Sequence, residues 1–360
     1  MGRWWGGRLT DYSESSDPPQ GTGSITVLDS HFNRVPYAIT VAHQEHQYPS
    51  IVLDNLLVEN SESVVLISGG EALLPGSGGP LWFNSWMSGY QVLPDGYSGR
   101  RTGFIGAKPN KPTALPGGQG GYFYRSKPQY GSGGLVVATE HGISNDATGD
   151  QTNAINALLR GNVGSTIFFP GGVYLVKGTV EIPAMARVGQ PGDSGVIEIS
   201  DMLFTTKEGT AGCILMEWNV HESHQGSAAI WDSHFRSLFT SVAAFLSSRM
   251  APTWFWGGGS EHAQLYQWQL LGASNIVMGH VQTEAPYYQD NPTALEPYTV
   301  AEWPADPGFE DCAEDFCKKA WALRILNSSD VFLYGLGLYS FSQDNNLGCA
   351  LSEECPTVFH

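Results

Sequence analysis

Short runs of apolar, mostly β-branched residues recur at regular intervals in the first part of the chain. They cover residues 24–28, 38–42, 50–54 and 63–67, and Ile39, Val52 and Val65 stand 13 residues apart. Asn, Asp, Pro and Ser separate the runs, a pattern typical of a solenoid in which each rung buries its apolar face on its neighbours. Two strands per rung predict a turn of about 26 residues. A set of ordinary antiparallel hairpins is the alternative.

The pattern changes to helical periodicity at residues 150–159 and then returns to strands. Asp150 or Thr152 can cap a short helix, whose apolar face is formed by Ala154, Ile155, Leu158 and Leu159. Residues 166–176 predict two strands about a tight turn. The helix is expected to cover the open edge of a following solenoid, which otherwise invites strand addition. Further strands are predicted at 196–204, 213–220, 264–271, 276–281, 321–326 and 331–339.

Residues 108–134 lack apolar periodicity and are dense in Gly and Pro, so we place a linker there. The sequence therefore predicts an all-β protein of the right-handed parallel β-helix type, the remnant of a tandem two-β-helix architecture. Residues 1–107 would form part of a first β-helix, and residues 135–360 a second one with a short N-terminal capping helix.

Composition supports many short strands and narrows the partners. The chain has 44 Gly and 21 Pro but only 15% charged residues, and its net charge of −17 excludes the basic surface that nucleic acids require. The 11 Trp, 15 Tyr and 16 Phe offer flat faces for sugar rings, although most aromatic residues are expected in the core. The chain has no run of 18 apolar residues and no export signal at its start, so we expect no membrane partner.

Five cysteines bear on the compartment and on metals. Cys312 with Cys317 and Cys349 with Cys355 are closely spaced pairs in loop-like sequence, which makes two local disulfides plausible. Cys213 lies in an apolar run and is expected to be a buried free thiol. The Cys and His spacings do not match a zinc site, so we expect no metal.

Two glutamates, Glu261 and Glu284, stand 23 residues apart in a segment of short apolar runs. If this segment coils as a β-helix, a spacing close to one turn places the carboxylates side by side on strands about 4.7–4.9 Å apart. Paired carboxylates are the machinery of glycoside hydrolysis, and the inverting form needs them roughly 6.5–9.5 Å apart with a water between. Two solvated surface glutamates are the alternative.

Several longer motifs resemble the fungal exo-β-1,3-glucanases of glycoside hydrolase family 55, within the pectate-lyase-like β-helix superfamily. They are the segments 187–201, 216–221, 231–234, Ser260-Glu-His-x-x-Leu-Tyr-Gln, Gln282-Thr-Glu-x-Pro-Tyr-Tyr-Gln and Gly337-Leu-Tyr-Ser-Phe. The resemblance covers residues 21 to 355. It implies two tandem β-helices, a laminarin-type β-1,3-glucan as substrate, release of glucose with inversion, no cofactor, a monomer, and an extracellular location that the cysteine pairs also favour.

By this resemblance Glu284 matches the general acid, and Glu261 matches the residue that helps to hold the attacking water. Tyr287, Tyr288 and Trp268 are expected as apolar walls that favour the protonated form of the acid. His262 and Gln282 complete the expected substrate-binding set.

The chain also departs from the family. Family members are longer, and this chain lacks rung sequence between Pro183 and Arg187 and between Arg236 and Gly257. Removal of whole rungs leaves a solenoid stackable, because each repeat contacts mainly its neighbours. A non-catalytic or degenerate glucan-binding β-helix is therefore a second hypothesis. A polysaccharide lyase is a third, which an acidic Ca²⁺ cluster and a basic residue beside Glu284 would support, but neither is visible in the sequence.

Overall fold

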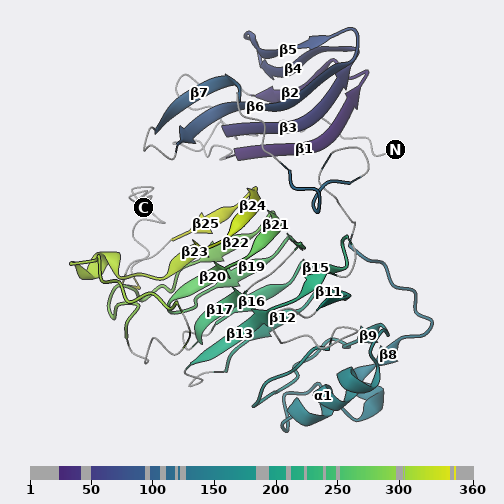
Figure 1. Cartoon of the computed structure of the whole chain (residues 1–360), viewed down its shortest axis with the longest axis vertical. Coiled ribbons are helices and arrows are strands. Elements are labelled where there is room, and N and C mark those ends of the chain that lie inside the picture. The colour runs from purple at the N-terminus through teal and green to yellow at the C-terminus, as the bar shows by residue number, and fades with distance from the viewer. Residues whose placement is uncertain are drawn as a thin grey trace, which may run out of the picture. The chain divides into compact units, whose positions relative to one another are not determined.

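A computed structural model describes residues 24–41, 50–93, 98–105, 111–117, 121, 127–183, 194–207, 212–222, 225–237, 241–248, 252–296, 303, 305–340 and 344–345. Over these residues the protein is mostly β-structure, with strands β1 to β25, one α-helix and two short 3-10 helices (Figure 1). The chain separates into two compact units. One comprises residues 1–111 and 116–122, and the other residues 112–115 and 123–360.

Two sheets make up the first unit. One has the strand order β1 (Ser24–Asn33), β3 (Ser50–Glu59), β6 (Leu81–Val92), β7 (Ser98–Phe104), and the other β2 (Tyr37–Val41), β4 (Ser61–Ile67), β5 (Ala72–Ser77). Ser24 pairs with Ser50 and Tyr37 with Ser63 in parallel register, which agrees with the 26-residue turn that the sequence predicts.

The repeat in the first unit ends at Ile67. Beyond it, β5 pairs antiparallel to β4, and β6 and β7 also pair antiparallel. A tight turn reverses the chain, with Gly69 at φ +75° and the amide of Ile67 donating to Glu71 O. Glycine adopts this left-handed conformation without steric cost, so the local sequence favours a hairpin over another parallel rung.

The first unit has its own apolar core, because alternate residues of its strands point to the space between the two sheets. The buried side chains are Ile39, Val41, Ile51, Leu53, Leu56, Val58, Val64, Val65, Leu74, Phe83 and Trp86.

The second unit begins with a small helical region. It contains β8 (Val136–Val137), the 3-10 helix η1 (Ala138–His141), α1 (Thr152–Gly161) and β9 (Ile167–Phe168). Asp150 Oδ1 accepts hydrogen bonds from the backbone N (3.0 Å) and hydroxyl (2.6 Å) of Thr152, which stabilises the first turn of the predicted helix. The predicted hairpin at 166–176 is reduced to β9 and one bridge between Asp146 and Val173.

Apolar residues join this helical region to the rest of the unit. Ile155, Leu158 and Leu159 of α1 pack with Ala138 and Ile143. Ile182 packs both against this cluster and against the large core that follows.

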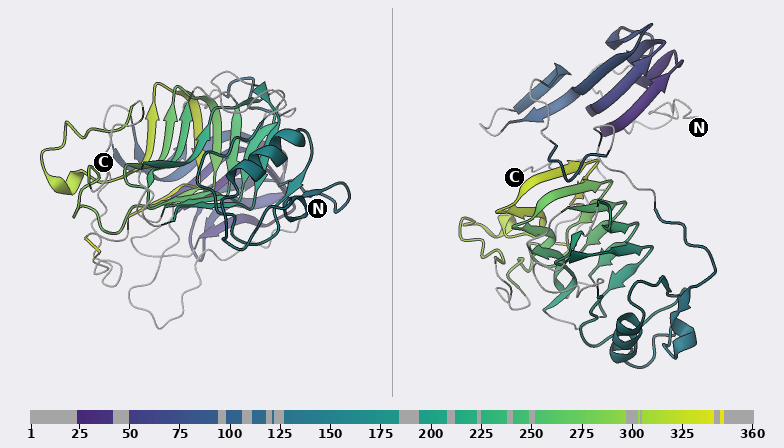
Figure 2. Two further views of the ribbon diagram at one scale, coloured as in Figure 1. Left: turned by 90° about the horizontal axis from the view of Figure 1, so that it is seen from below. Right: turned by 45° about the vertical axis from the view of Figure 1, so that its right-hand side comes forward.

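Three parallel sheets form the body of the second unit (Figures 1 and 2). The first contains β11 (Ile197–Ser200), β15 (Ala228–Trp231), β18 (Thr253–Trp256), β21 (Ser274–Gly279) and β24 (Ser329–Tyr334). The second, called the site sheet below, contains β12 (Leu203–Thr205), β16 (His234–Arg236), β19 (Gly259–Glu261), β22 (Gln282–Glu284) and β25 (Gly337–Tyr339). The third contains β13 (Cys213–Trp218), β17 (Ser241–Ser248), β20 (Tyr266–Leu271) and β23 (Trp321–Leu326). A short pair, β10 (Ser194–Gly195) with β14 (His221–Glu222), completes the unit.

The chain visits the three sheets in a fixed order, and we call one strand from each sheet, taken in sequence, a coil. All strand pairs in these sheets are parallel. Thr253 faces Ile276 in the next coil, whereas Ile276 faces Val331, because residues 285–320 leave the sheets between β22 and β23. This excursion contains the 3-10 helix η2 (Asp315–Cys317).

Sharp bends between the first and second strands of a coil use residues in the left-handed region. Asp232, Asn275 and Asp330 have φ of 46°, 59° and 54°. Asn and Asp tolerate this conformation better than other non-glycine residues. The corresponding turn positions expected for Asn275 and Asp330 are therefore confirmed.

Inside the three sheets lies one apolar core. Phe204 stacks on Phe235 with ring centroids 5.3 Å apart, and Phe235 meets Trp268 edge-on at 5.8 Å. These aromatic rings fill the space directly beneath the site sheet.

Residues just after the predicted linker attach to the second unit. Lys127 forms ion pairs with Asp201 and Asp232, and the Tyr130 hydroxyl donates to Glu198.

The cysteine predictions are partly tested. Cys312 and Cys317 form a disulfide with Cα atoms 6.0 Å apart, as predicted. Cys213 is a free thiol, but its side chain is half-buried rather than buried. Cys349 and Cys355 lie outside the described residues. Within the described part of the chain, α1 and the two 3-10 helices are too short and too polar to cross a membrane.

Candidate active site

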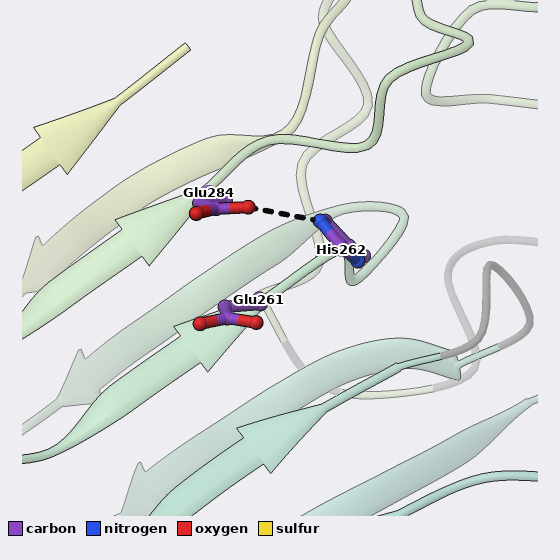
Figure 3. A group of neighbouring side chains, drawn as sticks. All are labelled: Glu261, His262 and Glu284. Atoms are coloured by element: carbon purple, nitrogen blue, oxygen red, sulfur yellow. Dashed lines mark hydrogen bonds and ion pairs between the residues drawn. The ribbon is translucent and has the colours of Figure 1, made fainter. Parts of the chain in front are cut away.

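Glu261 and Glu284 are the last residues of β19 and β22, and they pair directly in the register of the site sheet (Figure 3). Parallel register places equivalent residues one strand spacing apart with side chains on the same face. Oxygen atoms of the two carboxylates and a ring nitrogen of His262 all lie within 4.8 Å of one another. The 23-residue spacing therefore brings the two acids together, as predicted.

Glu284 is held through one of its two oxygens. Oε2 accepts hydrogen bonds from the Tyr287 hydroxyl (2.8 Å) and from Nε2 of His262 (3.2 Å). The other oxygen, Oε1, points away from His262 in Figure 3. With donors on Oε2, a proton carried by this side chain belongs on Oε1. The side chain of Glu284 keeps 21% of its surface exposed.

Glu261 is more deeply buried, at 8% exposure, and has donors on both oxygens. The Gln282 amide donates to Oε1 (3.0 Å), and Nε of Arg236 lies 3.5 Å from Oε2. Such donors stabilise a negative charge. Glu261 is thus built as a carboxylate, while Glu284 retains an oxygen for chemistry.

Arg236 was missed in the sequence. It is the last residue of β16 and pairs in register with Glu261. The available signal was its position in a short strand one coil before Glu261, at the same place relative to the strand end. Arg236 corrects the expectation that basic residues are absent from this neighbourhood.

His262 follows β19 in a left-handed conformation, with φ of 62°. Its backbone N donates to Glu284 O (2.9 Å), and its ring meets Tyr287 edge-on at 4.6 Å. Burial lowers the pKa of His262 below its ordinary value, although Glu284 and Glu261 act to raise it. Because the side chain is only 2% exposed, it acts on Glu284 and not as the predicted substrate contact.

The remaining predicted residues divide into two groups. Gln282 and Tyr287 hold the two carboxylates, and Tyr288 is half-buried in the same segment. Trp268 is 1% exposed and packs in the core against Phe235, so the expectation that it forms a wall of the groove is wrong. It supports the site sheet from inside, since its residues alternate between the two faces of β20.

The same three side chains match the ligand types of a divalent cation: Glu261, His262 and Glu284 each offer one ligand atom. Here, however, His262 is hydrogen-bonded to Glu284, and Glu261 is paired with Arg236. These contacts account for the closeness of the three groups by charge and hydrogen bonding alone.

The distance between the acids is shorter than expected. Inverting enzymes separate their carboxyl groups by roughly 6.5–9.5 Å, and retaining enzymes by about 5–5.5 Å. Oxygens of Glu261 and Glu284 lie within 4.8 Å, so the space for a water between them is missing. The direct register of β19 with β22 explains this, because adjacent parallel strands are closer than the inverting separation.

Comparison with known proteins places this geometry in a family context. Residues 136–245 match a family model described as rhamnogalacturonase A/epimerase, pectate lyase-like. A probable glucan endo-1,3-beta-glucosidase of Arthroderma benhamiae is 32% identical over 343 residues, which cover 69% of this chain and 39% of that protein. A glucan 1,3-beta-glucosidase of Cochliobolus carbonum is 26% identical over 440 residues, covering 94% of this chain and 54% of that protein.

The chain is a relative of the fungal β-1,3-glucanases. This confirms the relationship that its motifs indicate. A further relative, the non-secreted LysM effector LysM15 of Penicillium expansum, is 29% identical over 415 residues, covering 88% of this chain and 29% of that protein. The chain spans about half or less of the length of these relatives. Two of the alignments exceed its 360 residues, so those relatives contain residues inside the matched region that this chain lacks.

Proposed function

We propose that this protein is a glycoside hydrolase that releases glucose from β-1,3-glucan, with Glu284 as the general acid. The observation that carries the proposal is the asymmetric holding of the Glu284 carboxyl group. Oε2 is fixed by Tyr287 and His262, while the side chain remains partly exposed. The printed names of the glucanase relatives supply the substrate class.

The chemistry follows from this arrangement. A proton on Oε1 is transferred to the glycosidic oxygen as the bond to the anomeric carbon breaks. The negative charge left on Glu284 is then stabilised by the donors already present at Oε2. No bond rotation is needed, because Tyr287 and His262 hold the carboxyl group before the reaction.

Glu261 supplies the second carboxylate in this proposal. Its charge, fixed by Arg236 and Gln282, faces the region where the sugar ring gains positive character. Inversion, which the family resemblance implies, then requires a water held by groups other than Glu261 alone, because the pair is too close to contain it. If Glu261 itself attacks the sugar, the product retains its configuration.

The test is glucose release from laminarin by the wild type and by Glu284→Gln. The amide keeps the shape of the side chain but cannot donate the proton, so release should fall at least about 100-fold. Glu140→Gln, at an exposed glutamate of η1, is the matched control and should remain active. Undiminished release by Glu284→Gln would remove Glu284 from the role of acid. Proton NMR of the first product adds the stereochemistry: α-glucose indicates inversion, and β-glucose indicates attack by Glu261.

A second candidate is a non-catalytic glucan-binding protein. The short separation of the carboxylates and the residues that this chain lacks within the alignments favour it. Binding of laminarin without release of glucose would support this candidate.

The proposal includes an architecture and a location. We infer that the coils of the second unit form a right-handed parallel β-helix, supported by the three parallel sheets and the pectate-lyase-like match. We take residues 1–107 as part of a first β-helix, 108–134 as the linker and 135–360 as the second β-helix. The Cys312–Cys317 disulfide supports an extracellular location, because such bonds persist in oxidising compartments. A monomer is sufficient for the proposed activity, since one chain supplies both glutamates.

A further inference from the structure

One exposed aromatic residue beside the two glutamates has no role in the proposal so far. Tyr339 is the last residue of β25 and pairs in register with Glu284. Arg236, Glu261, Glu284 and Tyr339 therefore follow one another across four neighbouring strands of the site sheet. Tyr339 is 44% exposed, unlike Trp268, which is in the core.

The position of the Tyr339 ring is determined by the glycine two residues earlier. A Cβ atom added at Gly337 would lie 2.6 Å from Cε2, 2.8 Å from Cζ and 2.8 Å from the hydroxyl oxygen of Tyr339. The ring thus lies over Gly337, in space that any other residue would fill. Gly337 pairs with Gln282, the residue that holds Glu261, so the ring lies next to the polar side of the site.

We propose that Tyr339 is a stacking platform for a glucose ring of the glucan bound at Glu284. One face of the phenol ring rests on the backbone at Gly337, and the exposed part of the residue offers the other to the sugar. The C–H face of a glucose ring is apolar and flat enough to pack on an aromatic ring, which buries apolar surface on both partners. This inference rests on the proposed function for the identity of the ligand.

Gly337 gives the inference a test that does not alter the tyrosine. The φ of Gly337 is outside the left-handed region, so alanine is compatible with the backbone there. Its methyl group would force the Tyr339 ring away from the sheet. If the platform exists, Gly337→Ala and Tyr339→Ala should therefore cause the same defect.

The experiment is isothermal titration of laminaritetraose into protein that also has Glu284→Gln, which prevents turnover. Tyr339→Ala should weaken binding roughly tenfold, the effect of losing one stacking partner. Gly337→Ala should weaken it similarly, and the two changes together should add little, because both remove the same contact. Tyr339→Phe, which keeps the ring, should bind as tightly as the parent. Melting temperatures within a few degrees of the parent would separate lost binding from lost folding.

Unchanged affinity in Tyr339→Ala would overturn the platform. So would full additivity of the two changes, since they would then act at different places. Glucose release by the otherwise wild-type protein is measured in parallel. Activity together with unchanged affinity in Tyr339→Ala removes the platform and leaves the hydrolase. A wild type that neither binds nor cleaves laminarin removes both.

Discussion

At the scale of single residues, the burial of His262 links the acid to the stability of the fold. Its pKa is lowered from the ordinary value of 6.5, first by burial and also by Arg236, against the opposing hydrogen bond and charges of Glu284 and Glu261. The unfolded chain therefore binds a proton at higher pH than the folded protein does. The contribution of His262 to stability is complete above about pH 6.5 and declines as the pH falls from there to the lower pKa of the folded state.

This predicts a difference between two denaturation series. The free energy of unfolding of the wild type, measured with urea from pH 7.5 to 5, should fall more steeply below pH 6.5 than that of His262→Asn. Asparagine is chosen because it tolerates the φ of 62° at this position. Parallel curves for the two proteins would show that His262 does not titrate as proposed.

A second prediction concerns the donor on Glu284. Tyr287→Phe removes the hydroxyl that donates to Oε2, leaving the His262 donor in place. The kcat for glucose release should fall about tenfold, which corresponds to one hydrogen bond to a charged group, with little change in KM. Tyr174→Phe removes a hydroxyl that donates instead to Pro170 O, and it should leave kcat unchanged. A normal kcat in Tyr287→Phe would assign the holding of the acid to His262 alone.

At the scale of elements, the site sheet depends on the aromatic side chains beneath it. Phe235 is 1% exposed and contacts both Phe204 and Trp268. Phe235→Ala should destabilise the protein by about 3–5 kcal/mol, because it leaves a cavity that the surrounding strands cannot fill. Leu203→Ala, at a 60% exposed position of β12, is the control and should have little effect. Urea denaturation measures both, and equal stabilities would contradict the role of Phe235.

The elements also show what could be predicted from the sequence. The β-branched runs at 24–67 and the helix near Asp150 predict local structure, because their apolar spacing matches strand and helix periods. The antiparallel turn after Ile67 was missed, because an apolar run does not reveal the direction of its partner. Glu261 and Glu284 were found because their spacing equals one coil. Trp268 was misplaced because alternation along a strand decides which face a residue occupies, and its phase was unknown without the register.

At the scale of the whole molecule, the net charge of −17 separates neutral from acidic polysaccharides. A neutral glucan feels no long-range repulsion, so the KM for laminarin should change little between 50 and 500 mM NaCl. Polygalacturonate should be repelled at low salt, where screening is weakest. Tight binding of polygalacturonate at 50 mM NaCl, or unsaturated products from it, would favour the lyase hypothesis instead.

The position of Arg236 beside Glu261 depends on chain length as much as on chemistry. Parallel register pairs the two residues because β16 and β19 belong to successive coils. Gain of one whole coil between these strands would leave every ladder intact and yet give Glu261 a different neighbour. Loss of a coil would do the same in reverse. In a protein of this construction, evolution can change the partner of a catalytic side chain by insertion or deletion, without a single substitution at the site.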